Sequence, residues 1–296
     1  MCVGNMAHAS FSSSTDVRRV MRPRDVHSHK GDYGRLLIVG GSDVYSGAPA
    51  LAGIASLRTG VGLVFIAAPR GVASVIRSYS PDLIVHQLGE NVVTSDDLPA
   101  IGRLLTQSDA LVLGPGIGRD SETTAAVPRI IQKANDMNKP ILIDADAIRA
   151  VAGGDAYRHR SIVLTPHAGE FKALSGVEAP AGWRKRVPIC VNFAKTRSCV
   201  LLLKGHETIV TDGCRVKVNR TGNPGMAKGG MGDVLSGIIG TFLAQHADPF
   251  DAAVAGAYLQ GRAGDLLLKG KGFHMISSDL VEILPAVLKQ YDRLRS

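Results

Sequence analysis

The chain has 296 residues, of which 45% are hydrophobic, so it can bury a large core within one α/β domain. Its apolar runs, such as Val200–Leu203, are far shorter than the ~20 residues of a membrane-spanning helix, which argues against a membrane protein. The net charge of +8 favours anionic ligands, but the basic residues are spread along the chain without the stripe and interleaved aromatic residues of a nucleic-acid-binding surface.

The first 25 residues mix polar and basic residues without apolar periodicity, and they lack the apolar stretch of a secretory signal. We therefore expect a flexible extension over residues 1–25 and a single domain over residues 26–296. The spacing of the four cysteines indicates neither a zinc site nor a disulfide framework, so a reducing cytoplasm is the expected location. These cysteines are Cys2, Cys190, Cys199 and Cys214.

After this extension, apolar β-branched runs alternate with helical patterns such as Ala48–Thr59 and Glu122–Ala134. This alternation predicts repeated βαβ units, in which a mostly parallel sheet carries helices on both faces. The fold class is therefore α/β. The predicted strands are Arg35–Val39, Gly62–Ala67, Asp109–Leu113, Pro140–Ile143, Ser161–Leu164 and Cys199–Leu203.

The pattern changes in the last third of the chain. Short extended pieces from Glu207 to Val218 surround Asp212-Gly213, a dipeptide that favours a tight turn, and they predict a hairpin. The following stretch, Asn219–Gly232, holds five glycines and is expected to be irregular. Two helices, Asp233–Gln245 and Pro249–Leu268, are predicted beyond it.

The glycine-rich stretch carries the sharpest chemical signal, Asn223-Pro-Gly-Met-Ala-Lys-Gly-Gly-Met-Gly-Asp233. Glycines ahead of a helix let backbone amides converge on a phosphate, and the helix N-terminus adds positive potential there. The plainer interpretation is a turn in which Asp233 is only an N-cap. A carboxylate beside a phosphate site repels the anion, however, so Asp233 is predicted to be a general base for a substrate hydroxyl.

Two further motifs follow predicted strands, where the carboxyl ends of parallel strands present ligands. Lys204 and Thr208 follow one strand and could bind a nucleotide, although a lysine at a strand end is often merely solvated. His167 and Glu170 follow another, where the plainer interpretation is that Thr165 or Gly169 opens a helix and Glu170 complements its dipole.

Further groups lie at the same predicted edge. Asp144 and Asp146 follow the strand Ile141–Ile143 and could organise a metal ion or water. The loops at Gly40–Ala48 and Gly114–Gly118 also follow strands. Together these loops predict one cleft in a doubly wound sheet.

These stretches resemble the NAD(P)H-hydrate dehydratase family, whose domain is ribokinase-like. The resemblance runs from about His29 to Lys289. It rests on G-x-Y-G followed by G-G-S-D-x-Y-x-G-A, then L-G-P-G-I-G, I-D-A-D-A, T-P-H-x-G-E, K-G-x-x-T and N-P-G-M-A-x-G-G-x-G-D.

The resemblance implies an enzyme that uses ADP or ATP, with Mg²⁺, to phosphorylate the ring hydroxyl of the S epimer of NADHX or NADPHX. Loss of phosphate then restores NADH or NADPH. It implies that Asp233 is the catalytic base and also contacts the substrate. The other implied site residues are Gly229, Gly230, Met231 and Gly232 in an anion hole; Lys204, Gly205, His206, Glu207, Thr208 and Gly232 around the nucleotide; and Ala48, Gly116 and His167 around the dinucleotide.

The sequence departs from the family pattern at Met231, where Ser is frequent, at Ala168, where Pro is usual, and at Lys228, where Thr is frequent. The family also implies a homo-oligomer, which could be a tetramer. The epimerase domain fused in many relatives is absent, so a separate epimerase is expected to supply the S epimer. The sequence does not decide between ADP and ATP, although the standalone form resembles prokaryotic members, which favour ADP.

Two other functions fit the motifs. A small-molecule kinase acting on a vitamin precursor or a sugar would use the same base and anion hole, but it would accumulate a stable phosphoester. A catalytically silent nucleotide-binding sensor or scaffold would have no use for the negative charge of Asp233 beside phosphates.

Overall fold

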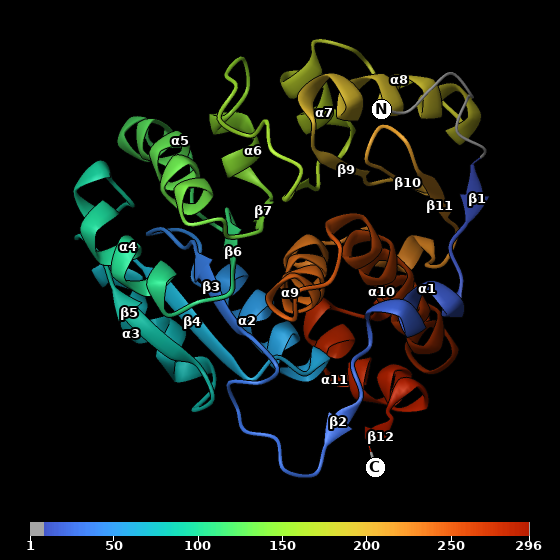
Figure 1. Ribbon diagram of the computed structural model, residues 1–296, viewed down its shortest axis with the longest axis horizontal. Helices are drawn as coiled ribbons and strands as arrows, with labels where there is room; N and C mark the ends of the chain where they lie inside the picture. Colours follow the sequence, from blue (N-terminus) through green and yellow to red (C-terminus); the bar gives the residue numbers. More distant parts are fainter. Residues whose placement is uncertain (1–8, 296) are drawn as a thin grey trace.

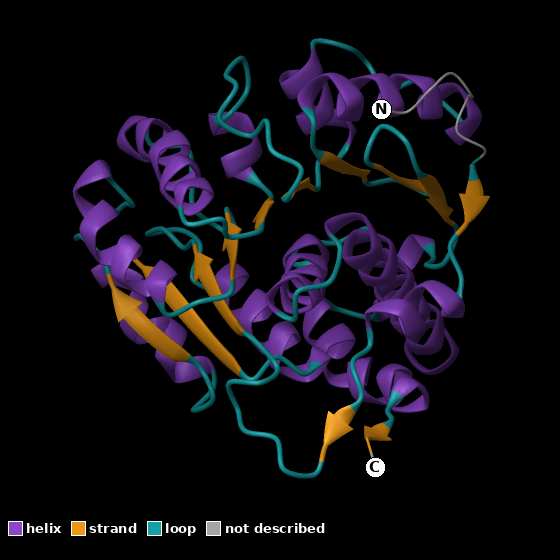
Figure 2. Ribbon diagram, in the orientation of Figure 1, coloured by secondary structure: helices purple, strands orange, loops and turns teal. Residues whose placement is uncertain are grey.

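The computed structural model describes residues 9–295, which form a curved sheet with helices on both faces (Figures 1 and 2). The main sheet has ten strands, all parallel except β10, which runs antiparallel to both of its neighbours. The predicted α/β class with a mostly parallel sheet is confirmed. In spatial order the strands are β1 (Ser10–Phe11), β11 (Val216–Asn219), β10 (Thr208–Thr211), β9 (Val200–Leu203), β8 (Ile162–Leu164), β7 (Ile141–Ile143), β6 (Ala110–Leu113), β3 (Arg35–Val39), β4 (Leu63–Ala68) and β5 (Ile84–Gln87).

Each face of the sheet is covered by its own set of helices. One set consists of α1 (Ser14–Val20), α2 (Gly47–Thr59), α3 (Arg70–Tyr79), α9 (Met231–Ala244), α10 (Pro249–Lys271) and α11 (Ser277–Leu288). The other set consists of α4 (Leu98–Thr106), α5 (Ser121–Asp136), α6 (Asp146–Ala150), α7 (Ala168–Ser175) and α8 (Trp183–Arg197). Short 3-10 helices are η1 (Ser95–Asp97), η2 (Pro224–Met226), η3 (Gly272–His274) and η4 (Lys289–Tyr291).

The strands are apolar throughout because both of their faces are buried. In β3, Leu36 and Ile38 face one core cluster, and Leu37 and Val39 face the other. This alternation follows from the two-residue period of a strand. No helix among residues 9–295 is long and apolar enough to cross a membrane.

The direction of strand addition reverses between β3 and β6, which are neighbours in the sheet. From β3 the chain continues to β4 and β5 on one side, whereas β6 is followed by β7, β8 and β9 on the other. Such a switch point opens a crevice at the carboxyl ends of the strands, where ligands bind in open α/β sheets.

The expectation of a flexible extension is wrong for residues 10–25, which form two short strands and a helix. In β1, Ser10 and Phe11 pair with the hairpin strand β11, and helix α1 packs on α10 with Val17 fully buried. Next, β2 (Arg24–Asp25) forms a small parallel sheet with β12 (Leu294–Arg295) at the other end of the chain. Residues 1–8 lie outside the described residues.

The predicted hairpin at Asp212-Gly213 is present as β10 and β11, whereas β5 was missed. The cysteines differ from expectation. Cys190 and Cys199 are buried free thiols, but Cys214 is disulfide-bonded, which its spacing in the sequence did not indicate. Cys2 lies outside the described residues.

Candidate active site

Helix α9 begins two residues before the predicted start. Gly230 is its N-cap, with a positive φ of 85°, and Met231 is its first residue. A side chain at Gly230 would also place its Cβ 2.4 Å from Ser277 Oγ, so the position requires glycine for two reasons. Asp233 lies within the first turn of the helix, and the interpretation of Asp233 as an N-cap is wrong.

The amides that precede Val234 surround the N-terminus of α9. Val234 N–H donates to the Gly230 carbonyl oxygen at 3.1 Å, whereas the amides before it lack partners within the helix. A Cβ at Gly229 would meet nothing within 4 Å, so this part of the loop faces open space. Free amides at a positive helix terminus suit an anion, as expected for Gly229, Gly230, Met231 and Gly232.

The carboxyl group of Asp233 has a pKa of about 7, well above its ordinary value. Burial is the largest cause, and the negative charge of Asp144 adds to it, while Lys204 lowers this pKa. A carboxyl group with this pKa exchanges its proton near neutral pH, where a general base is most effective. Asp233 therefore has the acid–base property that its predicted role requires.

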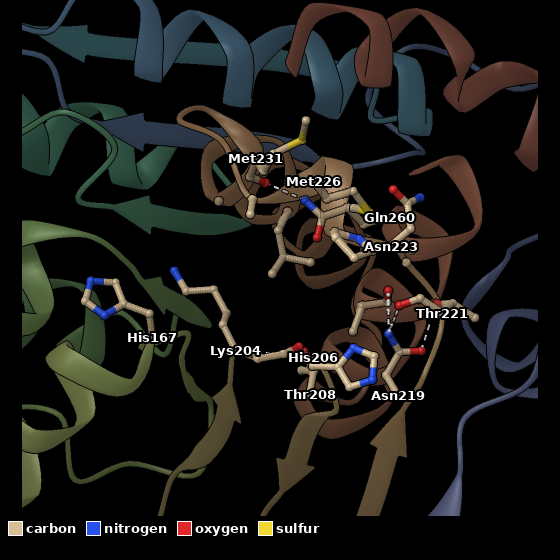
Figure 3. A pocket seen from close by; sticks show the side chains of 18 of the residues that line it. His167, Lys204, His206, Thr208, Asn219, Thr221, Asn223, Met226, Met231 and Gln260 are labelled. Carbon is tan, nitrogen blue, oxygen red and sulfur yellow. Dashed lines mark hydrogen bonds between the residues drawn. The ribbon is translucent and has the colours of Figure 1, made fainter. Parts of the chain in front are cut away.

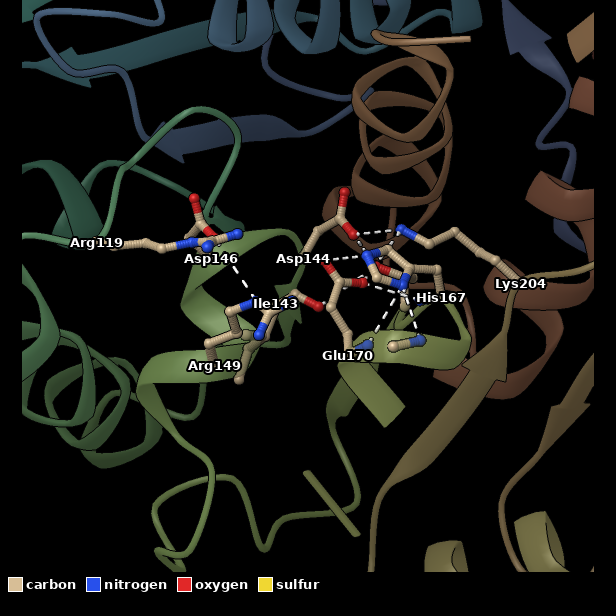
Figure 4. A network of polar contacts seen from close by, with 10 residues as sticks. Arg119, Ile143, Asp144, Asp146, Arg149, His167, Glu170 and Lys204 are labelled. Atoms are coloured by element: carbon tan, nitrogen blue, oxygen red, sulfur yellow. Dashed lines mark hydrogen bonds and ion pairs between the residues drawn. The ribbon is translucent and has the colours of Figure 1, made fainter. Parts of the chain in front are cut away.

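Asp144, directly after β7, is buried at the centre of a polar network (Figure 4). Its Oδ1 accepts hydrogen bonds from Lys204 Nζ (2.9 Å) and Thr165 Oγ1 (2.8 Å), and its Oδ2 accepts one from Ser236 Oγ (2.8 Å). Burial alone would raise the pKa of Asp144, but the Lys204 charge and these hydrogen bonds hold it below its usual value. Asp144 is therefore an ionised partner of Lys204.

Lys204 follows β9 and points toward this network. Its Nζ also lies 3.9 Å from Glu170 Oε2, and only 24% of its side chain is exposed, so the alternative of a merely solvated lysine is wrong. Burial would lower the pKa of Lys204, but the charges of Asp144, Glu170 and Asp233 raise it above its ordinary value. Lys204 thus presents a fixed positive charge at the edge of the sheet.

His167 is the N-cap of α7, so His167 opens the helix that Thr165 or Gly169 was expected to open. Its Nδ1 accepts hydrogen bonds from the amides of Gly169 (3.0 Å) and Glu170 (3.3 Å). Glu170 Oε2 accepts from the His167 amide at 2.8 Å, which completes a capping box. The motif therefore has a structural role, and its histidine also lines the pocket described next.

A pocket of about 620 Å³ lies between the β9–β10 connection, η2 and the start of α9 (Figure 3). Five of the six predicted nucleotide-binding residues line it, namely Lys204, Gly205, His206, Thr208 and Gly232. Thr208 Oγ1 donates to the Gly205 carbonyl oxygen at 3.1 Å and fixes the turn between them. Glu207 is not among the lining residues and forms an ion pair with Arg220 at 3.3 Å.

The predicted dinucleotide-binding residues Ala48 and Gly116 are neighbours at the switch point. A Cβ added at Gly116, which has a positive φ of 65°, would lie 3.1 Å from the Cβ of Ala48. His167, the third predicted residue of this group, instead lines the pocket that contains Lys204.

The family follows from comparisons of the whole chain with known proteins. A family model described as NAD(P)H-hydrate dehydratase matches residues 36–286. The chain belongs to this family. A bifunctional NAD(P)H-hydrate repair enzyme of Pyrobaculum aerophilum is 39% identical over 97% of the chain and 55% of the relative. The chain thus spans about half the length of this relative.

Two other family members match over nearly their whole length. The ADP-dependent (S)-NAD(P)H-hydrate dehydratase of Cenarchaeum symbiosum is 37% identical over 97% of this chain and 99% of that protein. The crystal structure of the ADP/ATP-dependent NAD(P)H-hydrate dehydratase of Bacillus subtilis, co-crystallised with ATP/Mg²⁺, is 29% identical, with a TM-score of 0.81 over 96% of this chain and 99% of that chain.

The structure shows what surrounds the three residues that depart from the family pattern. Met231 is only 6% exposed and its side chain packs in the core, while its backbone carbonyl accepts a hydrogen bond from Gln260. Lys228 Nζ donates to the carbonyl oxygens of Phe273 (2.9 Å) and Met275 (2.8 Å), which ties the glycine-rich loop to η3. Ala168 begins α7.

Sequence reasoning missed much of the pocket's far wall, which is lined by Asn219, Thr221, Asn223 and Gln260. The side-chain amide nitrogen of Asn223, Nδ2, is buried without a hydrogen-bond partner among the described residues. It is therefore an unsatisfied donor in the wall of this pocket. Asn223 stands at the start of a recognised motif, but nothing in the local sequence distinguishes Gln260 within α10.

Magnesium suits the carboxylates beside this pocket. Among residues 9–295, no group of three His, Cys, Asp or Glu side chains could hold a metal ion alone. Mg²⁺ usually keeps water and phosphate ligands and adds one or two carboxylates. Asp144 and Glu170, which lie 2.9 and 3.9 Å from Lys204 Nζ, would supply such ligands. Asp146 faces away and pairs with Arg119 at 2.7 Å (Figure 4).

Proposed function

We propose that the chain catalyses the nucleotide-dependent dehydration of the S epimer of NADHX and NADPHX, which restores NADH and NADPH and releases phosphate. The observation that carries the proposal is the Asp233 carboxyl group, whose pKa of about 7 places its proton exchange near neutral pH at the start of α9. The names of full-length relatives support the substrate.

The proposed reaction assigns one proton transfer to Asp233. The ring hydroxyl oxygen attacks the terminal phosphorus of the nucleotide, Asp233 accepts the hydroxyl proton, and the bond to the leaving AMP or ADP breaks. The ring C–O bond then breaks and its electron pair leaves with the phosphate, and loss of a proton from the neighbouring ring carbon restores the double bond. The amides at Gly229–Gly232 are placed to stabilise the charge that develops on the transferred group.

Lys204 has a positioning role in this proposal. Its ammonium group is held by Asp144 at 2.9 Å and lines the nucleotide pocket, so its charge is oriented before the nucleotide binds. A bound Mg²⁺ would neutralise phosphate charge there. Asn223, with its unpaired amide, is proposed as a further nucleotide contact.

The direct test is recovery of the NADH absorbance band when the protein is incubated with chemically prepared NADHX, Mg²⁺ and either ADP or ATP. Recovery with one nucleotide would name the phosphate donor, and the relatives named ADP-dependent favour ADP. Accumulation of a phosphorylated product without NADH would instead favour the small-molecule kinase. Nucleotide binding without any turnover would favour the sensor.

Two family properties remain part of this proposal, assembly into a homo-oligomer and supply of the S epimer by an epimerase. The cytoplasmic location expected from the cysteine spacing is also part of it. Relatives named as bifunctional repair enzymes support a link to a second repair activity. Light scattering would measure the assembly, and added epimerase should increase NADH recovery from a mixture of R and S epimers.

A further inference from the structure

A second large pocket lies at the opposite end of the sheet, where α2 and α9 end. Its volume is about 970 Å³. The two ends of the described chain build most of it, together with Gly60 and Gln245, the C-cap residues of α2 and α9. We call it the cationic pocket, because five basic residues line it against one acidic residue, Asp292. The basic residues are Arg22, Arg24, Arg58, Lys289 and Arg293.

None of these five side chains forms an ion pair with a carboxylate in the described part of the chain, although fifteen pairs between a Lys or Arg and a carboxylate occur elsewhere within it. Positive charges gathered around one pocket repel one another, and this repulsion is relieved by an anion between them. The arrangement is therefore more favourable with an anionic ligand than without one.

Structural roles account for only some of the basic residues. Arg24 donates to the Gly60 carbonyl oxygen at 2.7 Å and lies 3.6 Å over the Tyr33 ring, and Arg293 donates to the Met21 carbonyl oxygen at 2.8 Å. These contacts cap the ends of α2 and α1.

Arg22 donates to the Asp32 carbonyl oxygen at 3.5 Å, which leaves two basic residues unexplained. The side chains of Arg58 and Lys289 are exposed, and within residues 9–295 they have no hydrogen-bond or ion-pair partner. They are therefore available to a ligand, while Arg24 and Arg293 are already oriented by the fold.

We propose that the cationic pocket binds a phosphorylated organic anion of the nucleoside diphosphate or triphosphate class. The volume exceeds what a single phosphate would fill and lies within the range of small-molecule sites. Apolar side chains form part of the lining and suit the organic portion of such a ligand. They are Met21, Pro285, Ala286, Leu288 and Leu294.

This pocket is distinct from the candidate active site. No residue lines both pockets. Most of its lining residues, including Arg22, Arg24, Lys289 and Arg293, lie outside the stretch 36–286 that matches the family model. The proposal therefore does not depend on the dehydratase activity.

The test is calorimetric titration with inorganic tripolyphosphate and then with ADP, on the wild type and on the double variant Arg58→Gln/Lys289→Gln. The control is Arg103→Gln/Arg129→Gln, which removes two exposed charges from α4 and α5. We expect two sites in the wild type and the control. In the pocket variant, one site should weaken about tenfold or more, because it loses two charged hydrogen-bond donors.

The expected result also includes unchanged dehydration rates in the pocket variant, and a second site that binds ADP more tightly than tripolyphosphate. A single site in the wild type, or equal binding by the pocket variant, would overturn the proposal. A second site that prefers tripolyphosphate would overturn the assignment to an organic ligand. Failure of the dehydratase assay alone would leave these outcomes unaffected.

Discussion

The basic side chains at the two ends of the sheet differ in whether a carboxylate pairs with them. At the carboxyl ends of the strands, Lys204 is held at 2.9 Å by the buried carboxylate of Asp144. At the other end, Arg58 and Lys289 line a pocket without a partner among the described residues. The basic residues behind the net charge of +8 therefore differ in role. Burial and pairing with a carboxylate fix the charge of one, whereas exposed and unpaired side chains remain able to bind an anion.

This difference predicts that removing a positive charge lowers the stability of the protein at the paired site but not at the cationic pocket. Removing a charge from the paired, buried site leaves a carboxylate without its partner in a medium where charges interact strongly. Removing a charge from the cationic pocket relieves repulsion in contact with water, where the interaction is weak and screened by salt.

The largest effect is expected for Asp233→Asn, which keeps the shape of the side chain but removes the proton acceptor. The dehydration rate should fall roughly a hundredfold or more, while the Kd for ADP stays within a few-fold. Asp96→Asn, at an exposed position on η1, is the matched control. Equal rates for Asp233→Asn and wild type would exclude Asp233 as the base.

The paired charge is tested by Lys204→Met. Because this substitution leaves the buried Asp144 carboxylate without its charged partner, we expect a loss of about 3 kcal/mol in the free energy of unfolding. The control is Arg70→Met, which breaks the exposed Arg70–Glu90 pair and should cost less than about 1 kcal/mol. Urea denaturation of both variants measures the difference, and similar losses would mean that burial does not distinguish the two pairs.

The pH dependence of kcat/KM tests the cause of the raised pKa of Asp233. Asp233 must be ionised to accept a proton, and its pKa is raised to about 7, so kcat/KM should fall about tenfold for each pH unit below this value. In Asp144→Asn the midpoint should move to lower pH, because the charge of Asp144 is one cause of the raised pKa. An unmoved midpoint would show that burial alone sets it.

The smallest effect is expected for Arg58→Gln/Lys289→Gln without ligand. Relief of repulsion should leave the free energy of unfolding unchanged or raise it by at most about 0.5 kcal/mol at low salt, and the gain should vanish at high salt. Thermal unfolding at two ionic strengths measures it. A salt-independent loss would mean that these side chains stabilise the fold through contacts.

The sequence predicts the sheet well because its strands are buried on both faces and therefore read as apolar runs, as Val200–Leu203 does. It misses Ser10–Phe11 and helix α1, whose local pattern is polar. Their order comes from partners far along the chain, such as the hydrogen bond from Ser12 Oγ to Asn219 Oδ1.

In the candidate site, too, the sequence predicts local motifs but not contacts between residues far apart in the chain. Asp233 and the glycines before it form a local motif, so their chemistry can be argued from spacing alone. The bond from Ser236 to Asp144 joins residues 92 positions apart, and neither the network nor the raised pKa of Asp233 can be derived without the fold.

The pairing of β2 with β12 has a practical consequence for protein engineering. Arg293 reaches the Met21 carbonyl oxygen across 272 positions of the chain, so the two described ends already lie side by side. The chain is therefore a good candidate for circular permutation, with new ends opened in the exposed loop at Gly153–Asp155. A permuted protein would also hold the two walls of the cationic pocket on one continuous segment.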